Sequence, residues 1–147
     1  TAIRSFEPNQ KLVNRSNLDN GVMIVKLFPG ITDKILDACF AIEGLRGVVL
    51  ETYGSGNSPS LDWFMKSLEG AIKRGLILLN VSQCNGGRVI QGRYETSKEL
   101  LAVGVVSGAD MTTEAAVTKL MFLLGQKLSR EEICLQLTQS IAGEITT

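Results

Sequence analysis

The sequence predicts an α/β domain of three layers, with helices on both faces of a short, mostly parallel sheet of about four strands. Short apolar runs rich in β-branched residues alternate along the chain with segments whose apolar residues recur at helical spacing. Such alternation is typical of right-handed parallel crossovers. The chain has 147 residues and is 44% hydrophobic, which is enough for one domain with a substantial core.

The clearest strand covers residues 48–53 and begins with Val48, Val49 and Leu50. This run is typical of a strand buried on both faces of a parallel sheet. The strand ends at the glycine-rich turn Gly54–Asn57, and an amphipathic helix follows it. Open α/β sheets bind ligands at their carboxyl edge, where such a turn lies. A small-molecule site is therefore expected here, and the alternative is that the glycines only make a tight turn.

Three other segments are expected to be strands of the same sheet. Residues 22–28, 76–81 and 105–106 are apolar and end in loops that contain glycine. Residues 11–14 could form a further short strand, which would make a hairpin with the strand at 22–28.

Helix starts and stops are predicted from capping residues and glycines. The expected N-caps are Thr32, Ser60, Thr96 with Glu99 as a capping box, Asp110 or Thr112, and Ser129 with Glu132 as a second capping box. The expected stops are Gly44, Gly75, Gly104 and Gly125. The stripe of Phe64, Met65 and Leu68 is interpreted as core. Lys119 lies off the apolar stripe of its helix and is expected to be solvated.

Composition excludes several classes of function. Fifteen basic and fifteen acidic residues give no net charge, so no nucleic-acid or membrane partner is expected. No apolar run approaches the ~20 residues of a membrane helix, and no signal-peptide pattern is seen at the start. The chain has no histidine, which excludes Ser-His-Asp and Cys-His catalysis and histidine-ligated metals.

The three cysteines favour no metal or redox site. Cys39, Cys84 and Cys134 are widely spaced and form no Cys-x-x-Cys pair. They are interpreted as buried free thiols of a cytoplasmic protein.

The sequence contains no complete nucleotide-binding motif, and Thr1 could act as a nucleophile without histidine. Gly54-Ser55-Gly56 lacks the third glycine of a dinucleotide fingerprint, because Pro59 stands in its place, and no P-loop is present. An N-terminal threonine such as Thr1 can act as a nucleophile with its own amine as base. The parallel α/β pattern disfavours that class of hydrolase, so Thr1 is interpreted as the start of a fragment.

Four ordered segments resemble L-asparaginases of the cytoplasmic type. They are Leu27–Gly30, Gly47–Asn57, Asn80–Cys84 and Gly108–Ala115, and the closing Ala142–Thr146 fits as well. The resemblance covers about residues 11–146 and only the smaller, C-terminal domain of those enzymes. It implies that residues 1–20 are an interdomain connection and that residues 21–147 are the C-terminal domain.

The resemblance implies a function that this chain cannot perform alone. In that family a threonine nucleophile and a Thr-Asp-Lys group hydrolyse asparagine to aspartate and ammonia, and all of them belong to the N-terminal domain. No catalytic residue, metal or cofactor is therefore expected in this chain. The C-terminal domain completes the active site of a partner subunit in a close dimer. Ser55, Gly56 and Asn57 match the segment that does so, with the Asn57 carboxamide bonding substrate or a catalytic group. The implied partners are L-asparagine, the N-terminal domain and a second copy.

The resemblance also points to a candidate effector site. Some cytoplasmic members bind asparagine around the positions of Ser82, Gln83 and Cys84, but they carry arginine where this chain has Glu51. The acidic residue that secreted-type enzymes contribute has no clear match here, with Glu95 lying near. The rival interpretations are an asparaginase-like subunit of a tRNA-dependent amidotransferase and a stand-alone doubly wound module that binds a small ligand.

Overall fold

The computed structural model describes residues 13–90 and 95–146. In chain order, the elements are β1 (Val22–Lys26), α1 (Asp33–Phe40), β2 (Gly47–Thr52), α2 (Asp62–Lys73), β3 (Ile77–Ser82), α3 (Glu95–Ala102), β4 (Val106–Ser107), α4 (Thr113–Leu124) and α5 (Arg130–Leu137).

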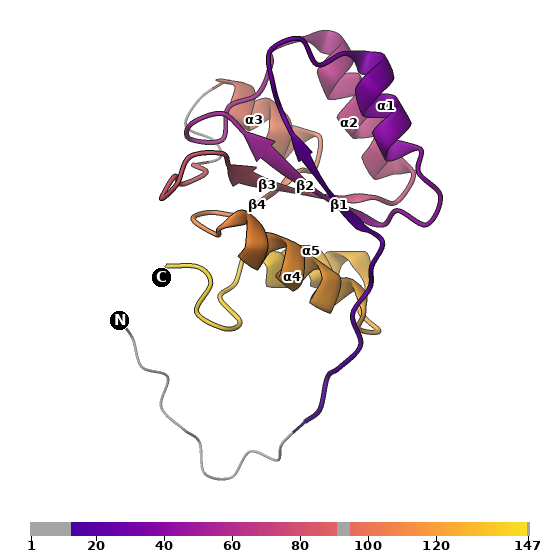
Figure 1. The fold of residues 1–147 in the computed structure, drawn as a ribbon, viewed down its shortest axis with the longest axis vertical. Coiled ribbons are helices and arrows are strands. Elements are labelled where there is room, and N and C mark those ends of the chain that lie inside the picture. Colours follow the sequence, from indigo (N-terminus) through magenta and orange to yellow (C-terminus); the bar gives the residue numbers. More distant parts are fainter. Residues whose placement is uncertain (1–12, 91–94, 147) are drawn as a thin grey trace.

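The predicted three-layer α/β fold is confirmed. In the described part of the chain, a four-stranded sheet has the order β1-β2-β3-β4, and every neighbouring pair is parallel. Helices α1, α2 and α3 lie on one face of this sheet and α4 and α5 on the other (Figure 1). Each crossover therefore returns the chain to the same end of the sheet, and the loops that follow the strands gather at the carboxyl edge.

Two apolar cores follow from the alternation of side chains along the central strands. On β2, Val48 and Leu50 face the core under α1, α2 and α3, whereas Val49 faces the core over α4 and α5. Phe64 and Leu68 of α2 are fully buried in the first core, so the interpretation of this stripe as core is confirmed.

The expected N-terminal hairpin is wrong. Val13 and Asn14 are not in a strand, and residues 11 and 12 lie outside the described part of the chain. The described segment that precedes β1 runs along α4 instead. The Asp19 amide donates to the Met121 carbonyl, and Gln126 Nε2 donates to the Asn17 carbonyl. These bonds hold the segment away from the free edge of β1.

Three of the predicted helix caps are confirmed. Thr32 caps α1, Thr112 caps α4, and Ser129 forms a complete capping box with Glu132 at the start of α5.

Other predicted helix limits are wrong. Leu61, not Ser60, is the N-cap residue of α2, without a side-chain cap, and α3 begins at Glu95, so that Thr96 lies inside the helix. α1 ends at Phe40, before Gly44.

Lys119 is buried, so the prediction of a solvated lysine is wrong. Its side chain is held by acceptors at the end of α5 and in the segment that follows it. Nζ donates to the Leu137 carbonyl at 3.1 Å and to the Gln139 carbonyl at 2.5 Å, and it lies 2.6 Å from Glu144 Oε1. This one ammonium group ties α4 to the C-terminal segment.

Candidate functional site

The turn after β2 lies at the carboxyl edge, as predicted, and its backbone is closed on itself. The Tyr53 amide donates to the Asn57 carbonyl at 2.9 Å, and the Asn57 amide donates back to the Tyr53 carbonyl at 2.8 Å. Gly54 and Gly56 both have positive φ, 50° and 99°, which glycine adopts without strain. The turn is thus a small antiparallel loop with Ser55 at its tip.

Side chains of β3 hold both glycine carbonyls of this turn. Ser82 Oγ donates to the Gly54 carbonyl at 2.5 Å, and Asn80 Nδ2 donates to the Gly56 carbonyl at 3.3 Å. Thr52 Oγ1 donates in turn to Asn80 Oδ1 at 2.6 Å. Polar side chains at the ends of β2 and β3 therefore hold the turn through its carbonyl groups.

The loop after β3 closes over the same turn. The Ile90 amide donates to the Ser55 carbonyl at 3.1 Å, and the Val89 amide donates to the Ala109 carbonyl at 2.8 Å. A Cβ placed on Gly56 would lie only 2.7 Å from Val89 Cγ1. The loop after β3 thus packs against the turn at Gly56 and is itself bonded to the loop after β4.

Replacing Gly56 with alanine is expected to lower the free energy of unfolding by about 2 kcal/mol, because positive φ and the Val89 contact both disfavour a Cβ. Gly54→Ala is the matched control. It also adds a methyl group at positive φ, but that methyl meets no atom within 4 Å. Urea denaturation should show the larger loss for Gly56→Ala, and equal losses would contradict the close packing at Gly56.

The three residues expected at an effector site, Ser82, Gln83 and Cys84, make different contacts in the structure. Gln83 Nε2 donates to the carbonyls of Leu27 and Glu51, at 2.6 and 2.8 Å, and so ties the ends of β1 and β2 together. Ser82 holds the turn at Gly54, and its Oγ accepts from the Cys84 amide. The expectation of buried cysteines is wrong, because Cys84 is exposed and Cys39 and Cys134 are only partly buried.

Glu51 has partners of its own on the α4 face of the sheet. Its Oε1 accepts from Thr113 Oγ1 at 2.5 Å, and its Oε2 lies 3.7 Å from Lys26 Nζ. The side chain of Glu95, like Thr1, lies outside the described part of the chain.

Asp110 does not cap α4, although the sequence allowed it. Its carboxylate accepts from the Thr146 amide at 3.0 Å. Hydrogen bonds, first from the Thr146 side chain, lower the pKa of Asp110 against the opposing effect of desolvation. This carboxylate therefore anchors the C-terminal segment next to the β4 loop.

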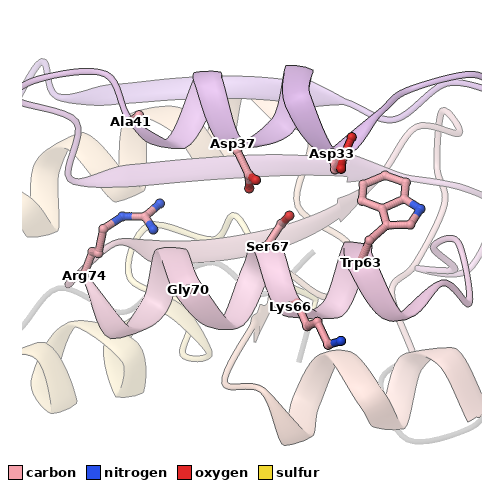
Figure 2. Close-up of a pocket in the computed structure, with 8 residues that line it drawn as sticks. All are labelled: Asp33, Asp37, Ala41, Trp63, Lys66, Ser67, Gly70 and Arg74. Carbon is pink, nitrogen blue, oxygen red and sulfur yellow. The ribbon is translucent and has the colours of Figure 1, made fainter.

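A hollow of about 600 Å³ lies between α1 and α2, away from the turn. Asp33 and Asp37 line its α1 side, and Lys66 and Arg74 line its α2 side, as Figure 2 shows. Opposite charges on the two walls offset each other, which is typical of solvated faces of paired helices. The sequence analysis did not single out these residues, because isolated charges on helices carry no motif.

Two residues of the carboxyl edge were missed by the sequence analysis. Thr52 and Asn80 are both fully buried, and both belong to strands. A signal for one of them was present: Asn80 interrupts the apolar run Ile77–Val81, and a buried amide needs hydrogen-bond partners. Among residues 13–90 and 95–146, the structure contains no group of three or more Cys, Asp or Glu side chains placed to hold a metal.

Residues 21–136 match the family model for the glutaminase/asparaginase C-terminal domain. The chain belongs to this family. The predicted resemblance to asparaginases is thereby confirmed at the level of the family. Within the described ranges, no helix of this asparaginase C-terminal domain has the length and apolarity to cross a membrane.

Several relatives share this domain. L-asparaginase 1 of Escherichia coli K12 is 38% identical over 123 residues, which are 84% of this chain and 36% of the relative. A glutamyl-tRNA(Gln) amidotransferase subunit of Methanopyrus kandleri is 40% identical over 124 residues, which are 84% of this chain and 26% of the relative. The crystal structure of L-asparaginase I from Vibrio cholerae superposes with a TM-score of 0.89 at 34% identity, covering 95% of this chain and 42% of that one. The asparaginase C-terminal domain thus spans between about a quarter and two fifths of each of these proteins.

Proposed function

We propose that this domain is the C-terminal part of an L-asparaginase that hydrolyses L-asparagine to L-aspartate and ammonia. The observation that carries the proposal is the fixed Gly54–Asn57 turn at the carboxyl edge, in a chain 38% identical to L-asparaginase 1. A turn held through its glycine carbonyls can present Ser55 and Asn57 to a second protein surface without further ordering. Preformed geometry of this kind lowers the entropic cost of assembling an active site.

The proposal assigns the nucleophile to an N-terminal domain. The chain has no histidine, and the Thr113 hydroxyl, which donates to Glu51 near the carboxyl edge, ties the start of α4 to the end of β2. Thr52, Ser82 and Gln83 also donate their protons to internal acceptors. On this proposal residues 1–20 connect the two domains, and the chain alone is inactive.

The remaining parts of the proposal concern assembly and location. Ser55, Gly56 and Asn57 of one copy complete the active site of a second copy, so the assembled enzyme is at least a homodimer. Ser82, Gln83 and Cys84 remain a candidate effector site. The free thiols of Cys39, Cys84 and Cys134 fit a reducing cytoplasm.

A second candidate function is that of an amidotransferase subunit, which the 40% identity to the Methanopyrus kandleri protein favours. The zero net charge of the chain disfavours a tRNA-binding face, because such a face needs an excess of Lys and Arg. Tight binding of tRNA by the chain would favour this second candidate over the asparaginase.

The test pairs this chain with the N-terminal domain of the E. coli L-asparaginase 1, in one fused polypeptide, and measures ammonia release from asparagine. The fused protein is expected to be active, and the 147-residue chain is expected to be silent. Asn57→Ala should lower kcat/KM at least tenfold, because a hydrogen bond to a charged group contributes about 1.5–3 kcal/mol. Asn85→Ala, in an exposed loop position, is the matched control and should change little.

Two outcomes would contradict this proposal. One is a fused protein that folds and dimerises, as shown by its mass in solution and its circular dichroism, yet releases no ammonia. The other is ammonia release by the 147-residue chain that disappears in Thr1→Ala, which would indicate an N-terminal threonine hydrolase.

A further inference from the structure

A polar pair lies inside the sheet, where the sequence is otherwise apolar. Thr52 and Asn80 have no exposed surface, and their neighbours on the same face of the two strands are Leu50 and Leu78 of the first core. Burying an amide costs free energy unless its donors and acceptors are bonded. The parallel ladder between β2 and β3 uses backbone groups only, so neither side chain is needed to pair the strands.

The hydrogen bonds of this pair lead out of the sheet to the turn. The Thr52 hydroxyl has one proton and two acceptors within reach: its Oγ1 lies 2.6 Å from Asn80 Oδ1 and 3.2 Å from the Val81 carbonyl, so the shorter bond goes to Asn80. This bond fixes the orientation of the carboxamide, so that Nδ2 faces the Gly56 carbonyl at 3.3 Å. The reversed carboxamide would set two oxygens against each other at Gly56. The Gly56 carbonyl and the Thr52 hydroxyl therefore favour the same orientation of Asn80, one as acceptor for Nδ2 and the other as donor to Oδ1.

The backbone of Asn80 reaches a second loop. Its carbonyl accepts from the Gly108 amide at 2.8 Å, and a Cβ on Gly108 would lie 2.8 Å from this same oxygen. Asn80 is thus the residue at which the turn after β2 and the loop after β4 are joined. Its side chain donates to the turn after β2, and its main-chain carbonyl accepts from the loop after β4.

We propose that Asn80 is a positioning residue for the Gly54–Asn57 turn and that Thr52 sets the orientation of its carboxamide. The two side chains hold the Gly56 carbonyl from inside the fold and thereby fix the backbone from which Ser55 and Asn57 project. The consequence for catalysis rests on the proposed function, because it requires that the turn completes an active site. The consequence for the turn itself does not.

The first arm of the test uses the 147-residue chain and amide hydrogen exchange. The Gly56 and Asn57 amides both donate to the Tyr53 carbonyl and report on the turn, whereas the amides of Val49 and Leu79 report on global opening. Thr52→Val removes the hydroxyl and keeps the shape of the side chain. It is expected to speed exchange at Gly56 and Asn57 at least tenfold relative to Val49 and Leu79.

Two variants serve as controls for this arm. Thr52→Ser keeps the hydroxyl and should restore the protection of the turn. Thr118→Val removes a hydroxyl that bonds only to carbonyls of its own helix, and it should leave the turn unchanged. Equal acceleration at the turn and in the strands, or no acceleration at the turn, would overturn the positioning role. Failure of Thr52→Ser to restore protection would overturn it as well.

The second arm uses the fused two-domain protein. Thr52→Val should lower kcat/KM for asparagine at least fivefold with the fraction folded unchanged, and Thr52→Ser should return it to within twofold. Wild-type activity in a Thr52→Val protein whose turn has lost protection would overturn the catalytic consequence. A fused protein that releases no ammonia in any form, together with local loss of protection in Thr52→Val, contradicts the proposed function and supports the positioning role.

Discussion

Replacing Lys119 with methionine is expected to lower the free energy of unfolding by about 3–5 kcal/mol, a range typical for loss of one partner from a buried ion pair. The side chain of Lys119 is 4% exposed and that of Glu144 is 12% exposed. Methionine fills much of the same space, so the expected loss comes from charge and hydrogen bonding rather than from a cavity. Urea denaturation monitored by the single tryptophan would measure it.

The size of this effect follows from the number of groups left behind. Without the ammonium, the Glu144 carboxylate loses its cation, and the carbonyls of Leu137 and Gln139 lose their donor. A buried group without its partner bears the full cost of desolvation. The segment after α5 should therefore separate from α4, and its amides should exchange with solvent.

Two comparisons isolate the contribution of the ion pair. Lys127→Met changes an exposed lysine just after α4 and should stay within about 0.5 kcal/mol of the unchanged protein. The double variant Lys119→Met with Glu144→Gln removes both charges and should lose less than the sum of the two single losses. Additive losses in the double variant would show that the two side chains do not act as a pair.

Lys119 also shows what a sequence pattern leaves out. Its position off the apolar stripe of α4 predicted a solvated side chain, because helical spacing reports only on the face of its own helix. Its acceptors come from residue 137, at the end of α5, and from residues 139 and 144 in the irregular segment that follows, about twenty residues later. No local rule places that segment over α4.

Local rules succeeded where the physical cause is itself local. The apolar runs of β2 and β3 predicted a sheet covered on both faces, and the capping box of Ser129 and Glu132 needs only residues of one turn. The prediction that Ser60 caps α2 was wrong, although the cause there is local as well. The helix begins one residue later than Ser60 allows, with Asp62 in its first turn, where a carboxylate interacts favourably with the helix dipole.

In the candidate site too, the sequence predicted the locally determined feature and missed the contacts between distant residues. A strand that ends in Gly-Ser-Gly predicted the position of the turn at the carboxyl edge, and the structure places it there. The residues that hold the turn, Thr52 and Asn80, lie 28 positions apart and meet only because β2 and β3 pair in one register. A polar residue within an apolar strand run is the sequence signal for such a pair, and its partner becomes known only with the strand register.

Acid should destabilise this domain through Glu144 in particular. Burial by itself raises the pKa of Glu144, but hydrogen bonds from the Ile141 amide, Lys119 and the Ala142 amide outweigh that effect and lower the pKa from 4.5 to about 2. The folded state thus holds this carboxyl ionised more strongly than the unfolded state does. Its contribution to stability is present in full above about pH 4.5 and is lost as the pH falls toward 2.

The expected loss over this range is about 3 kcal/mol, since one pKa unit corresponds to roughly 1.4 kcal/mol. Urea denaturation at a series of pH values from about 7 to about 2 measures it. Glu144→Gln should be less stable than the unchanged protein at neutral pH and should lose less stability on acidification. Part of the acid loss should remain in this variant, because the pKa values of Asp19 and Asp110 are also lowered by their hydrogen bonds. Parallel pH profiles for the two proteins would show that Glu144 is not the main acid-sensitive group, and would leave the bonds of Lys119 to main-chain carbonyls and the bond of Asp110 to the Thr146 amide to hold the C-terminal segment.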